Sequence, residues 1–314
     1  MRNRKARLTA FAGAFALVTG LGVPAYAQTA TPSAATPSVA TPSLAAPSFA
    51  TPSLVASAAD AGAPAVYGRA AYLMDARSGA ALFGKAADTR MPIASLTKTM
   101  TAYVVLQSAK PTDMVEIAPQ DARYAEEGGG TTADLRPGDR LPVGELLYAL
   151  MLPSGADAAH ALARTYGPGV PGFVDKMNAT ARSLGMNDTR YVNADGLPTP
   201  AGDGWSTARD QAVLAAKALQ VPLIEGVAGT RYHEVAATEE HGAYGWRNTN
   251  RLLAEPGVIG LKTGFTRAAG YSLAFAGERD GHRLVGVILG ESVSSRRFDT
   301  AQSLLTWAPT RTAA

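Results

Sequence analysis

A proline at every fifth position, from Pro32 to Pro52, limits which part of this chain can fold. Each proline stands in a Thr-Pro-Ser or Ala-Pro-Ser triplet, and the residues between the triplets are mostly small. Proline lacks the backbone N–H that helices and sheets need, and small residues bury too little surface to offset the entropy of ordering. We therefore predict a disordered linker rich in Thr-Pro-Ser and alanine over residues 28–65, with the folded part after it.

The N-terminus has the composition of a secretion signal. Basic residues precede an apolar run from Leu8 to Val23, and residues 25–27 read Ala-Tyr-Ala, which suits a signal peptidase. The sequence predicts a signal peptide over residues 1–27 and export to the periplasm or the cell-wall space. An N-terminal membrane anchor is the alternative, although a span needs about 20 apolar residues. We expect no stable membrane anchor elsewhere in the chain.

Composition argues against several classes of protein. The chain has no cysteine, so it forms no disulfide, thiolate metal site or cysteine nucleophile. Its four histidines show no metal-ligand spacing, and we expect no metal and no cofactor. The net charge of +3 is too small and too scattered for a nucleic-acid-binding surface. Hydrophobic residues make up 46% of the chain, which is ample for a packed core.

From residue 66 to about residue 309 the chain alternates strand and helix patterns, as one globular domain does. Strands are predicted at residues 71–75, 81–83, 258–261, 271–276 and 284–289. Helices are predicted at residues 96–107, 142–152, 157–163 and 297–306. The pair Asp280-Gly281 suits a two-residue hairpin turn. Strands at both ends, with mostly helices between them, indicate an antiparallel sheet built from both termini.

Ser95 and Lys98 form a Ser-x-x-Lys motif at the predicted start of a helix. Residues three apart on a helix share a face, so the hydroxyl and the ammonium lie within reach of each other. A serine becomes a strong nucleophile only when a base takes its proton. A lysine can be that base if burial or a second cation lowers its pKa from about 10.4. The motif alone is common, and Ser95 has the alternative role of a helix N-cap.

Two further motifs follow along the chain. Residues 154–156 read Ser-Gly-Ala and lie in a tight corner between two predicted helices, because Pro153 ends the first of them. Residues 262–264 read Lys-Thr-Gly and lie on a predicted strand. The lysine is a candidate second cation, and the glycine allows a close backbone approach. Each motif is weak alone, but the three in this order are the set found in β-lactamases and penicillin-binding proteins.

The segments around these motifs resemble the low-molecular-mass penicillin-binding proteins of the D-alanyl-D-alanine carboxypeptidase family. The similar stretches are residues 92–102, 147–155, 248–253, 260–266, 269–271 and 304–307. The resemblance implies an α+β fold of the β-lactamase and DD-peptidase type: an antiparallel sheet flanked by helices, with an inserted mainly helical lobe. It also implies a catalytic domain over residues 66–310 and no β-rich C-terminal domain.

The same resemblance implies a serine-type D-Ala-D-Ala carboxypeptidase. Such an enzyme acts on peptidoglycan stem peptides and reacts covalently with β-lactam antibiotics. Ser95 becomes the acyl-ester nucleophile, Lys98 the general base, and Ser154 a proton relay to the leaving amine. The substrate-binding residues are Lys262, Thr263, Gly264, Phe265 and Arg297. Among them, the lysine, the threonine and the arginine hold the terminal carboxylate, while the N–H groups of Ser95 and Phe265 form an oxyanion hole.

Ala156 departs from the family pattern, which has asparagine at this position. Loss of one positioned donor costs about 2–4 kcal/mol, or roughly 10²–10³ in rate. Either water or another side chain replaces the amide and the enzyme works, or the site acylates poorly and the protein mainly binds the cell wall without turnover. If the missing amide matters, Ala156→Asn leaves activity equal or higher. A clear drop would mean that the corner is built around alanine.

Other functions stay open at this point. A D-Ala-D-X endopeptidase would cut cross-links with the same residues. A β-lactamase would need a deacylating base, often a glutamate after the second motif. The glutamates there read as helix-end or loop residues: Glu225, Glu234, Glu239, Glu240 and Glu255. A catalytically weak wall-binding homologue rests on Ala156 alone. The sequence makes no prediction about oligomeric state.

Overall fold

The computed structural model describes residues 62–312, with side chains for residues 62–310. The signal peptide predicted over residues 1–27 lies outside the described residues, as does the predicted linker up to residue 61. The strands are β1 (Ala70–Asp75), β2 (Ala81–Lys85), β3 (Met114–Glu116), β4 (Arg140–Pro142), β5 (Tyr232–Val235), β6 (Tyr244–Arg247), β7 (Val258–Thr266), β8 (Gly270–Arg279) and β9 (His282–Glu291). The α-helices are α1 (Thr97–Val105), α2 (Pro119–Glu127), α3 (Val143–Met151), α4 (Ala156–Tyr166), α5 (Gly169–Ser183), α6 (Ala208–Ala218), α7 (Pro222–Gly229), α8 (Arg296–Trp307) and α9 (Pro309–Thr312). The 3₁₀ turns are η1 (Ala94–Leu96) and η2 (Arg251–Ala254).

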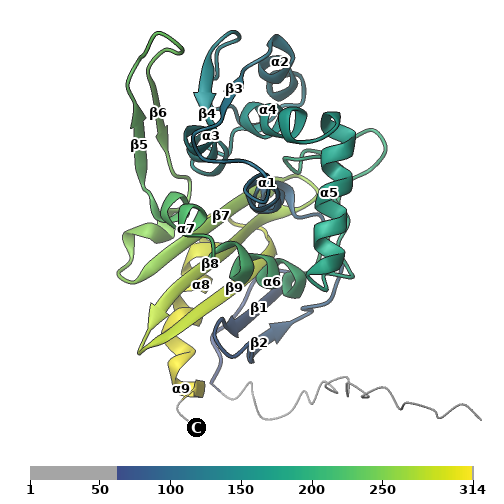
Figure 1. Cartoon of the computed structure of the whole chain (residues 1–314). Coiled ribbons are helices and arrows are strands. Elements are labelled where there is room, and N and C mark those ends of the chain that lie inside the picture. The colour runs from purple at the N-terminus through teal and green to yellow at the C-terminus, as the bar shows by residue number, and fades with distance from the viewer. Residues whose placement is uncertain (1–61, 313–314) are drawn as a thin grey trace, which may run out of the picture. The chain divides into compact units, whose positions relative to one another are not determined.

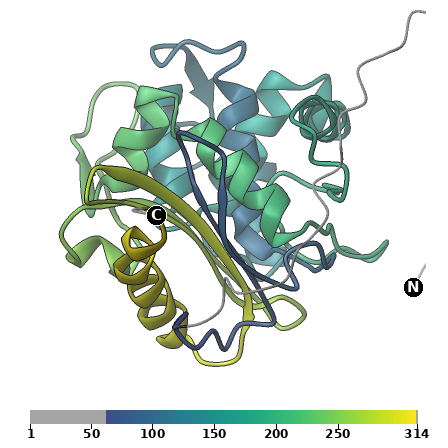
Figure 2. The same ribbon diagram turned by 90° about the horizontal axis from the view of Figure 1, so that it is seen from below.

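Five of the strands form one antiparallel sheet in the order β2-β1-β9-β8-β7. The first two strands of the chain thus pair with its last three, as the sequence predicts. Helix α8 packs on one face of this sheet, and α6 packs on the other (Figures 1 and 2). The α+β fold with an antiparallel sheet flanked by helices is therefore confirmed.

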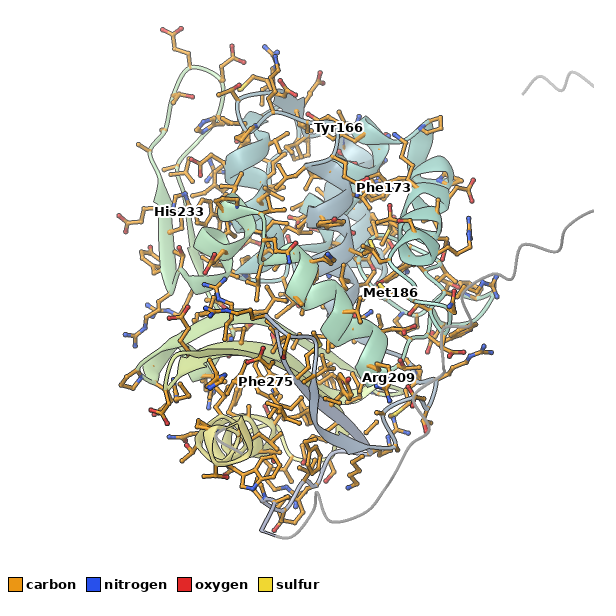
Figure 3. All side chains as sticks on the ribbon, turned by 60° about the horizontal axis from the view of Figure 1, so that its bottom comes forward. Tyr166, Phe173, Met186, Arg209, His233 and Phe275 are labelled. Carbon is orange, nitrogen blue, oxygen red and sulfur yellow. The ribbon has the colours of Figure 1, made fainter. Side chains whose placement is uncertain are left out.

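Successive side chains of the central strands point alternately into two hydrophobic cores, one on each face of the sheet. In β1, Tyr72 and Met74 join the core under the helical lobe, while Leu73 joins the smaller core under α8. Side chains of a strand alternate between its two faces, so a strand buried on both sides has no polar stripe. Figure 3 shows Phe173 in the core of the lobe and Phe275 between the sheet and α8.

The segment between β2 and β7 forms the helical lobe, which covers the other face of the sheet (Figure 1). Helix α1 runs through its centre and contacts α3, α4, α5 and α6. Two small antiparallel sheets, β3 with β4 and the β5–β6 hairpin, lie at the edge of this lobe. The lobe therefore places the N-terminus of α1 against the sheet edge formed by β7.

Most predicted elements lie within a few residues of their observed bounds. The helix predicted over residues 96–107 is α1, the hairpin turn at Asp280-Gly281 joins β8 to β9, and the helix predicted over residues 297–306 is α8. Between residues 62 and 312, no single helix is long and apolar enough to cross a membrane. One sharply bent pair, α6 with α7, passes the same test by length and composition.

Candidate active site

Ser95 and Lys98 lie together at the point where α1 begins. Ser95 is in the 3₁₀ turn η1, directly before α1, and Lys98 is in the first turn of α1. Lys98 Nζ is 3.1 Å from Ser95 Oγ. The side chain of Ser95 caps neither element, because the residues at both N-cap positions are others and make no side-chain cap bond. The alternative role of Ser95 as an N-cap is therefore wrong.

Burial makes Lys98 a base that can work near neutral pH. The residue is 1% exposed, and its Nζ donates a second hydrogen bond to the main-chain oxygen of Asp195 at 2.9 Å. Burial lowers the pKa of Lys98 to about 8, although the negative charges of Asp195 and Asp157 act in the opposite direction. A lysine with this pKa is neutral in a useful fraction of molecules and can accept the proton of a neighbouring hydroxyl.

Ser154 occupies the corner between α3 and α4, as predicted. Its φ of +70° places it in the left-handed region, which residues with a side chain rarely adopt. The residue is 6% exposed, and its Oγ has no hydrogen-bond partner among the residues that the structure describes. A strained residue with an unpartnered hydroxyl, held in place by two helices, is typical of a functional position.

The Lys-Thr-Gly motif lies in the middle of β7, the edge strand next to the lobe. Lys262 is 1% exposed and donates to the carbonyl of Thr263 at 3.0 Å. Its pKa lies well below the usual value because of burial and because of the positive charges of Lys98 and Arg297. The hydroxyl of Thr263 shares a 2.7 Å hydrogen bond with the hydroxyl of Thr249. The strand thus brings a second lysine close to the Ser95–Lys98 pair.

Gly264 allows β7 to approach the turn that carries Ser95. A Cβ atom at this position would lie 3.0 Å from the carbonyl oxygen of Ile93 and 3.2 Å from the nitrogen of Ser95. Real Cβ atoms rarely come so close to backbone, so a side chain here would push the strand away from Ser95. The glycine is thus needed for the contact between β7 and the turn η1, in addition to the close approach of a substrate that the sequence predicts.

Phe265 and Arg297 both contact Tyr271, the partner of Phe265 on β8. Phe265 is 51% exposed and stacks on Tyr271 with ring centroids 4.3 Å apart. Arg297 is 8% exposed, and its guanidinium donates to the carbonyls of Gly264 and Ser272 at 3.0 and 3.2 Å. Burial lowers the pKa of Arg297 to about 10. The arginine therefore supports the strand that carries the third motif, with its charge close to Lys262.

Ala156 is the first residue of α4 and is fully buried. Its N–H donates to the carbonyl of Thr131 at 2.7 Å. A Cβ at Gly130 would lie 3.1 Å from the Cβ of Ala156 and 2.8 Å from a methyl group of Leu197. The loop after α2 thus closes over the small side chain at position 156.

Sequence reasoning missed two aspartates near the motifs. The main chain of Asp195 positions Lys98, and the carboxylate of Asp157 accepts hydrogen bonds from the N–H groups of Ala133, Leu135 and Ala158 and from the hydroxyl of Thr132. Asp157 thereby ties the loop after α2 to the start of α4. The run Asn193-Ala194-Asp195-Gly196 is a loop signal, but nothing in it indicates a contact with Lys98. Within residues 62–312, no group of three or more acidic or histidine side chains has the geometry of a metal site.

The sequence profile of the family described as D-alanyl-D-alanine carboxypeptidase, peptidase S11, matches residues 57–293, which is most of this chain. The chain belongs to this family. A D-alanyl-D-alanine carboxypeptidase of Streptomyces strain K15 is 36% identical over 253 residues, which cover 76% of this chain and 86% of that protein. The match to this peptidase family identifies the chain as a peptidase, and therefore a hydrolase.

Two other relatives show how the S11 family varies. The carboxypeptidase DacC of Escherichia coli is 36% identical over 78% of this chain, but the chain spans only 62% of that protein's length. A D-alanyl-D-alanine endopeptidase of Pseudomonas aeruginosa is 34% identical and covers 76% of both chains. Family members of similar sequence thus carry the names of two different peptidase activities.

The solved structure of the Streptomyces K15 DD-transpeptidase has the same fold as this S11 peptidase. It superimposes with a TM-score of 0.75 at 34% identity, covering 79% of this chain and 99% of that one. The predicted fold of the DD-peptidase type is therefore confirmed.

Proposed function

We propose that this S11 peptidase removes the terminal D-alanine from peptidoglycan stem peptides through an acyl-enzyme on Ser95. The observation that carries the proposal is the position of the buried Lys98 Nζ, 3.1 Å from Ser95 Oγ. At that distance the neutral amine takes the hydroxyl proton as Ser95 attacks the carbonyl of the penultimate D-alanine. The new C–O bond forms as the carbonyl becomes an oxyanion.

The remaining motif residues have roles that agree with their surroundings. The N–H groups of Ser95 and Phe265 stabilise the oxyanion, since Gly264 lets β7 approach the turn that carries Ser95. The unpartnered hydroxyl of Ser154 passes a proton to the leaving amine. Lys262 and Thr263 hold the terminal carboxylate, with Arg297 adding its charge from behind the strand. Water then hydrolyses the ester, and penicillins acylate the same serine.

Export is part of the same proposal, because the substrate belongs to the cell wall. The predicted signal peptide over residues 1–27 supports it. The names of the E. coli and P. aeruginosa relatives, a D-alanyl-D-alanine carboxypeptidase and a D-alanyl-D-alanine endopeptidase, agree with such a substrate. After removal of the signal peptide, the predicted linker over residues 28–65 would form the new N-terminus, followed by the catalytic domain over residues 66–310.

An endopeptidase acting on D-alanyl cross-links is the second candidate, and the P. aeruginosa relative favours it. A β-lactamase has less support, because three of the five glutamates after the second motif are engaged elsewhere: Glu225 with Arg283, Glu240 with Arg140 and Glu255 with Gln302. A wall-binding homologue with weak catalysis would bind stem peptides without turnover.

The deciding experiment measures D-alanine release by the purified protein from a pentapeptide that ends in D-Ala-D-Ala. We expect release by the wild type and by Ser108→Ala, an exposed serine beyond α1, but none by Ser95→Ala. Labelled penicillin should appear on Ser95 when the adduct is mapped by mass. Undiminished release by Ser95→Ala would show that the nucleophile is misassigned. Cleavage of a cross-linked dimer without release from the pentapeptide would favour the endopeptidase.

A further inference from the structure

A pocket of about 270 Å³ lies at the base of the β5–β6 hairpin, beside the third motif rather than within it. Three of its lining residues are arginines: Arg231 precedes β5, Arg247 ends β6 and Arg251 begins η2. The other lining residues are Asn248, Asn250 and Ala254. We call this the arginine pocket. Figure 1 shows the hairpin, whose end near α7 leads towards β7.

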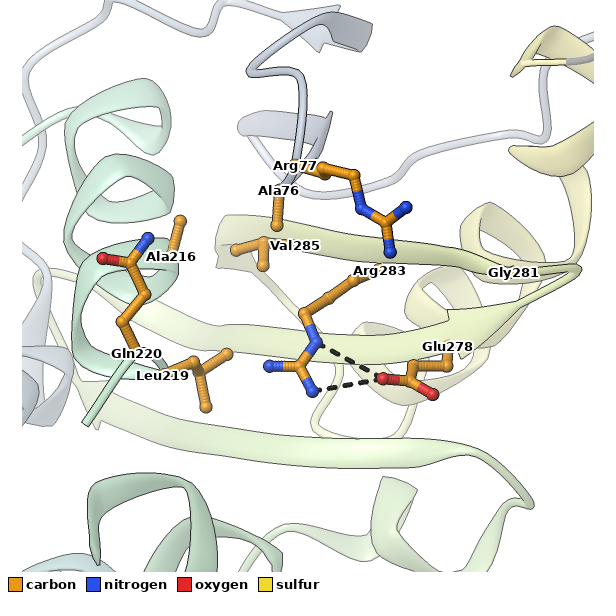
Figure 4. Close-up of a pocket in the computed structure, with 9 residues that line it drawn as sticks. All are labelled: Ala76, Arg77, Ala216, Leu219, Gln220, Glu278, Gly281, Arg283 and Val285. Carbon is orange, nitrogen blue, oxygen red and sulfur yellow. Dashed lines mark hydrogen bonds and ion pairs between the residues drawn. The ribbon is translucent and has the colours of Figure 1, made fainter. Parts of the chain in front are cut away.

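The lining of the arginine pocket contains positively charged residues and no negatively charged one. None of its three arginines makes an ion pair or a side-chain hydrogen bond with another described residue. Arg247 is restrained by the ring of Tyr232, which lies 5.4 Å from its guanidinium carbon. A larger cavity, of about 370 Å³, is lined by two arginines. There Arg283 is paired with Glu278 (Figure 4) and with Glu225, while Arg77 makes no ion pair with a described residue.

Asn250 adds a buried donor to the same pocket. The residue is 3% exposed, and its Oδ1 accepts a hydrogen bond from the N–H of Leu252 at 3.1 Å. That bond fixes the amide orientation, so the group left over is Nδ2, a donor with no partner in the described part of the chain. Asn248 is fully engaged by contrast, since it accepts from the N–H of Asn250 and donates to the carbonyls of Ala228 and Thr230.

Solvated surface arginines are the simplest alternative, because exposed guanidinium groups need no partner. That alternative does not explain why Asn250, a residue of the same lining, has a buried amide donor without a partner in the described part of the chain, since such groups are nearly always paired. Three guanidinium groups and an amide offer only donors. They match the acceptor oxygens of a carboxylate or a phosphate, which arginine can bind through two parallel hydrogen bonds.

The pocket also adjoins the catalytic residues. Thr249, between the two lining asparagines, makes the 2.7 Å hydrogen bond to Thr263 of the third motif. The positive charge of Arg251 lowers the pKa of Arg297, in addition to the larger effect of burial. A ligand that neutralised Arg251 would therefore raise the pKa of Arg297, whose own charge affects Lys262.

We propose that the arginine pocket binds an oxyanion group, a carboxylate or a phosphate, of a cell-wall polymer. Its volume lies just below the range of about 300–1,000 Å³ that is usual for sites of whole small molecules. The pocket therefore fits a charged group at the end or side of a larger ligand. The choice of a cell-wall polymer rests on the proposed function, whereas the binding of an oxyanion group does not depend on the reaction at Ser95.

The test is calorimetric titration of the purified protein with inorganic pyrophosphate and, separately, with propane-1,2,3-tricarboxylate, at an ionic strength held constant with sodium chloride. We expect saturable binding at one site. Arg247→Gln and Arg251→Gln should each weaken it by about tenfold, the usual effect of losing a hydrogen bond to a charged group. The matched control is Arg123→Gln, an exposed arginine on α2, which should bind as the wild type does.

Asn250→Asp gives an independent readout. The aspartate can still accept from the N–H of Leu252, but it replaces the free donor by a charged acceptor, so binding should be lost. Saturable binding of pyrophosphate alone would identify a phosphate-bearing polymer, and binding of the tricarboxylate alone would identify peptide carboxylates. No saturable binding of either probe, or equal weakening by Arg123→Gln, would overturn the proposal. If Asn250→Asp does not fold, Arg247→Gln and Arg251→Gln still test the proposal.

Discussion

The main-chain oxygen of Asp195 lies 2.9 Å from Nζ of Lys98, although 97 residues separate them in the chain. Together with the 3.1 Å contact to Ser95 Oγ, this bond aims the amine at the nucleophile. Gly196 makes the arrangement possible: its φ is +84°, and a Cβ there would overlap the carbonyl of Ala94. The loop that follows α5 therefore packs directly against the turn that carries Ser95.

The depressed pKa of Lys98 predicts the pH dependence of acylation. Below a pKa of about 8 the amine is protonated and cannot take the serine proton, so the rate should fall about tenfold for each pH unit further down. The measurement is the rate of labelling by a fluorescent penicillin between pH 6 and pH 10. A rate that continues to rise up to pH 10 would mean that Lys98 keeps an ordinary pKa and is not buried as described.

Asp195→Asn should move that rise to lower pH. The substitution keeps the main-chain oxygen that holds Lys98 but removes a negative charge that raises the lysine pKa. With the pKa lower, more of the amine is neutral at pH 7, and acylation there should be as fast as in the wild type or faster. The matched control is Asp175→Asn, an exposed aspartate on α5, which should leave the profile unchanged. A shift to higher pH would contradict the electrostatic account.

Sequence patterns predicted several elements whose structure is determined by their local sequence. The apolar run of β1, the turn at Asp280-Gly281 and the apolar face of α1 are local, and each has its physical cause within a few residues. The three motifs were recognisable for the same reason. The short strands β3, β4, β5 and β6 were missed, because strands of three or four residues carry too little periodicity to be recognised.

Contacts between distant segments were out of reach. Any residue can supply the main-chain oxygen that Asp195 offers to Lys98, so no side-chain pattern marks it. Ser154 gives no sign of its left-handed backbone, which two helices impose on it. The arginine pocket depends on where β5, β6 and η2 meet, and its three arginines are up to 20 residues apart in the chain. Such features arise from packing and were seen only in the structure.

Two substitutions at Ser154 should separate its chemistry from its strain. Ser154→Ala and Ser154→Gly both remove the hydroxyl, so both should release D-alanine far more slowly than the wild type. Glycine adopts a φ of +70° without strain, whereas alanine does not, so the glycine variant should be more stable than the alanine variant by about 1 kcal/mol. Thermal unfolding followed by circular dichroism would show this as a difference of about 2–4 °C. Full activity of either variant would exclude the proton relay.

Ala156→Asn tests whether the missing amide of the second motif can be restored. The side chain at position 156 is fully buried, and a Cβ at Gly130 would already lie 3.1 Å from the Cβ of Ala156, so the space between that loop and position 156 is narrow. Asparagine would have to displace that loop, and overpacking of this kind typically costs about 1–3 kcal/mol. We therefore expect Ala156→Asn to lower the stability of the protein and to slow acylation. That result would mean that the corner is built around alanine. The measurements are thermal unfolding and the rate of penicillin labelling.

The matched control for this prediction is Ala179→Asn, an exposed alanine on α5, which reports the cost of asparagine in a helix without overpacking. A second variant identifies the obstacle. A methyl group of Leu197 lies next to Gly130, so Leu197→Ala should give the loop room to move. If crowding is the cause, the double variant Ala156→Asn with Leu197→Ala should label faster than Ala156→Asn alone. Faster labelling by the single variant than by the wild type would instead show that the corner accepts the amide, and that the enzyme works below its attainable rate because the amide is missing.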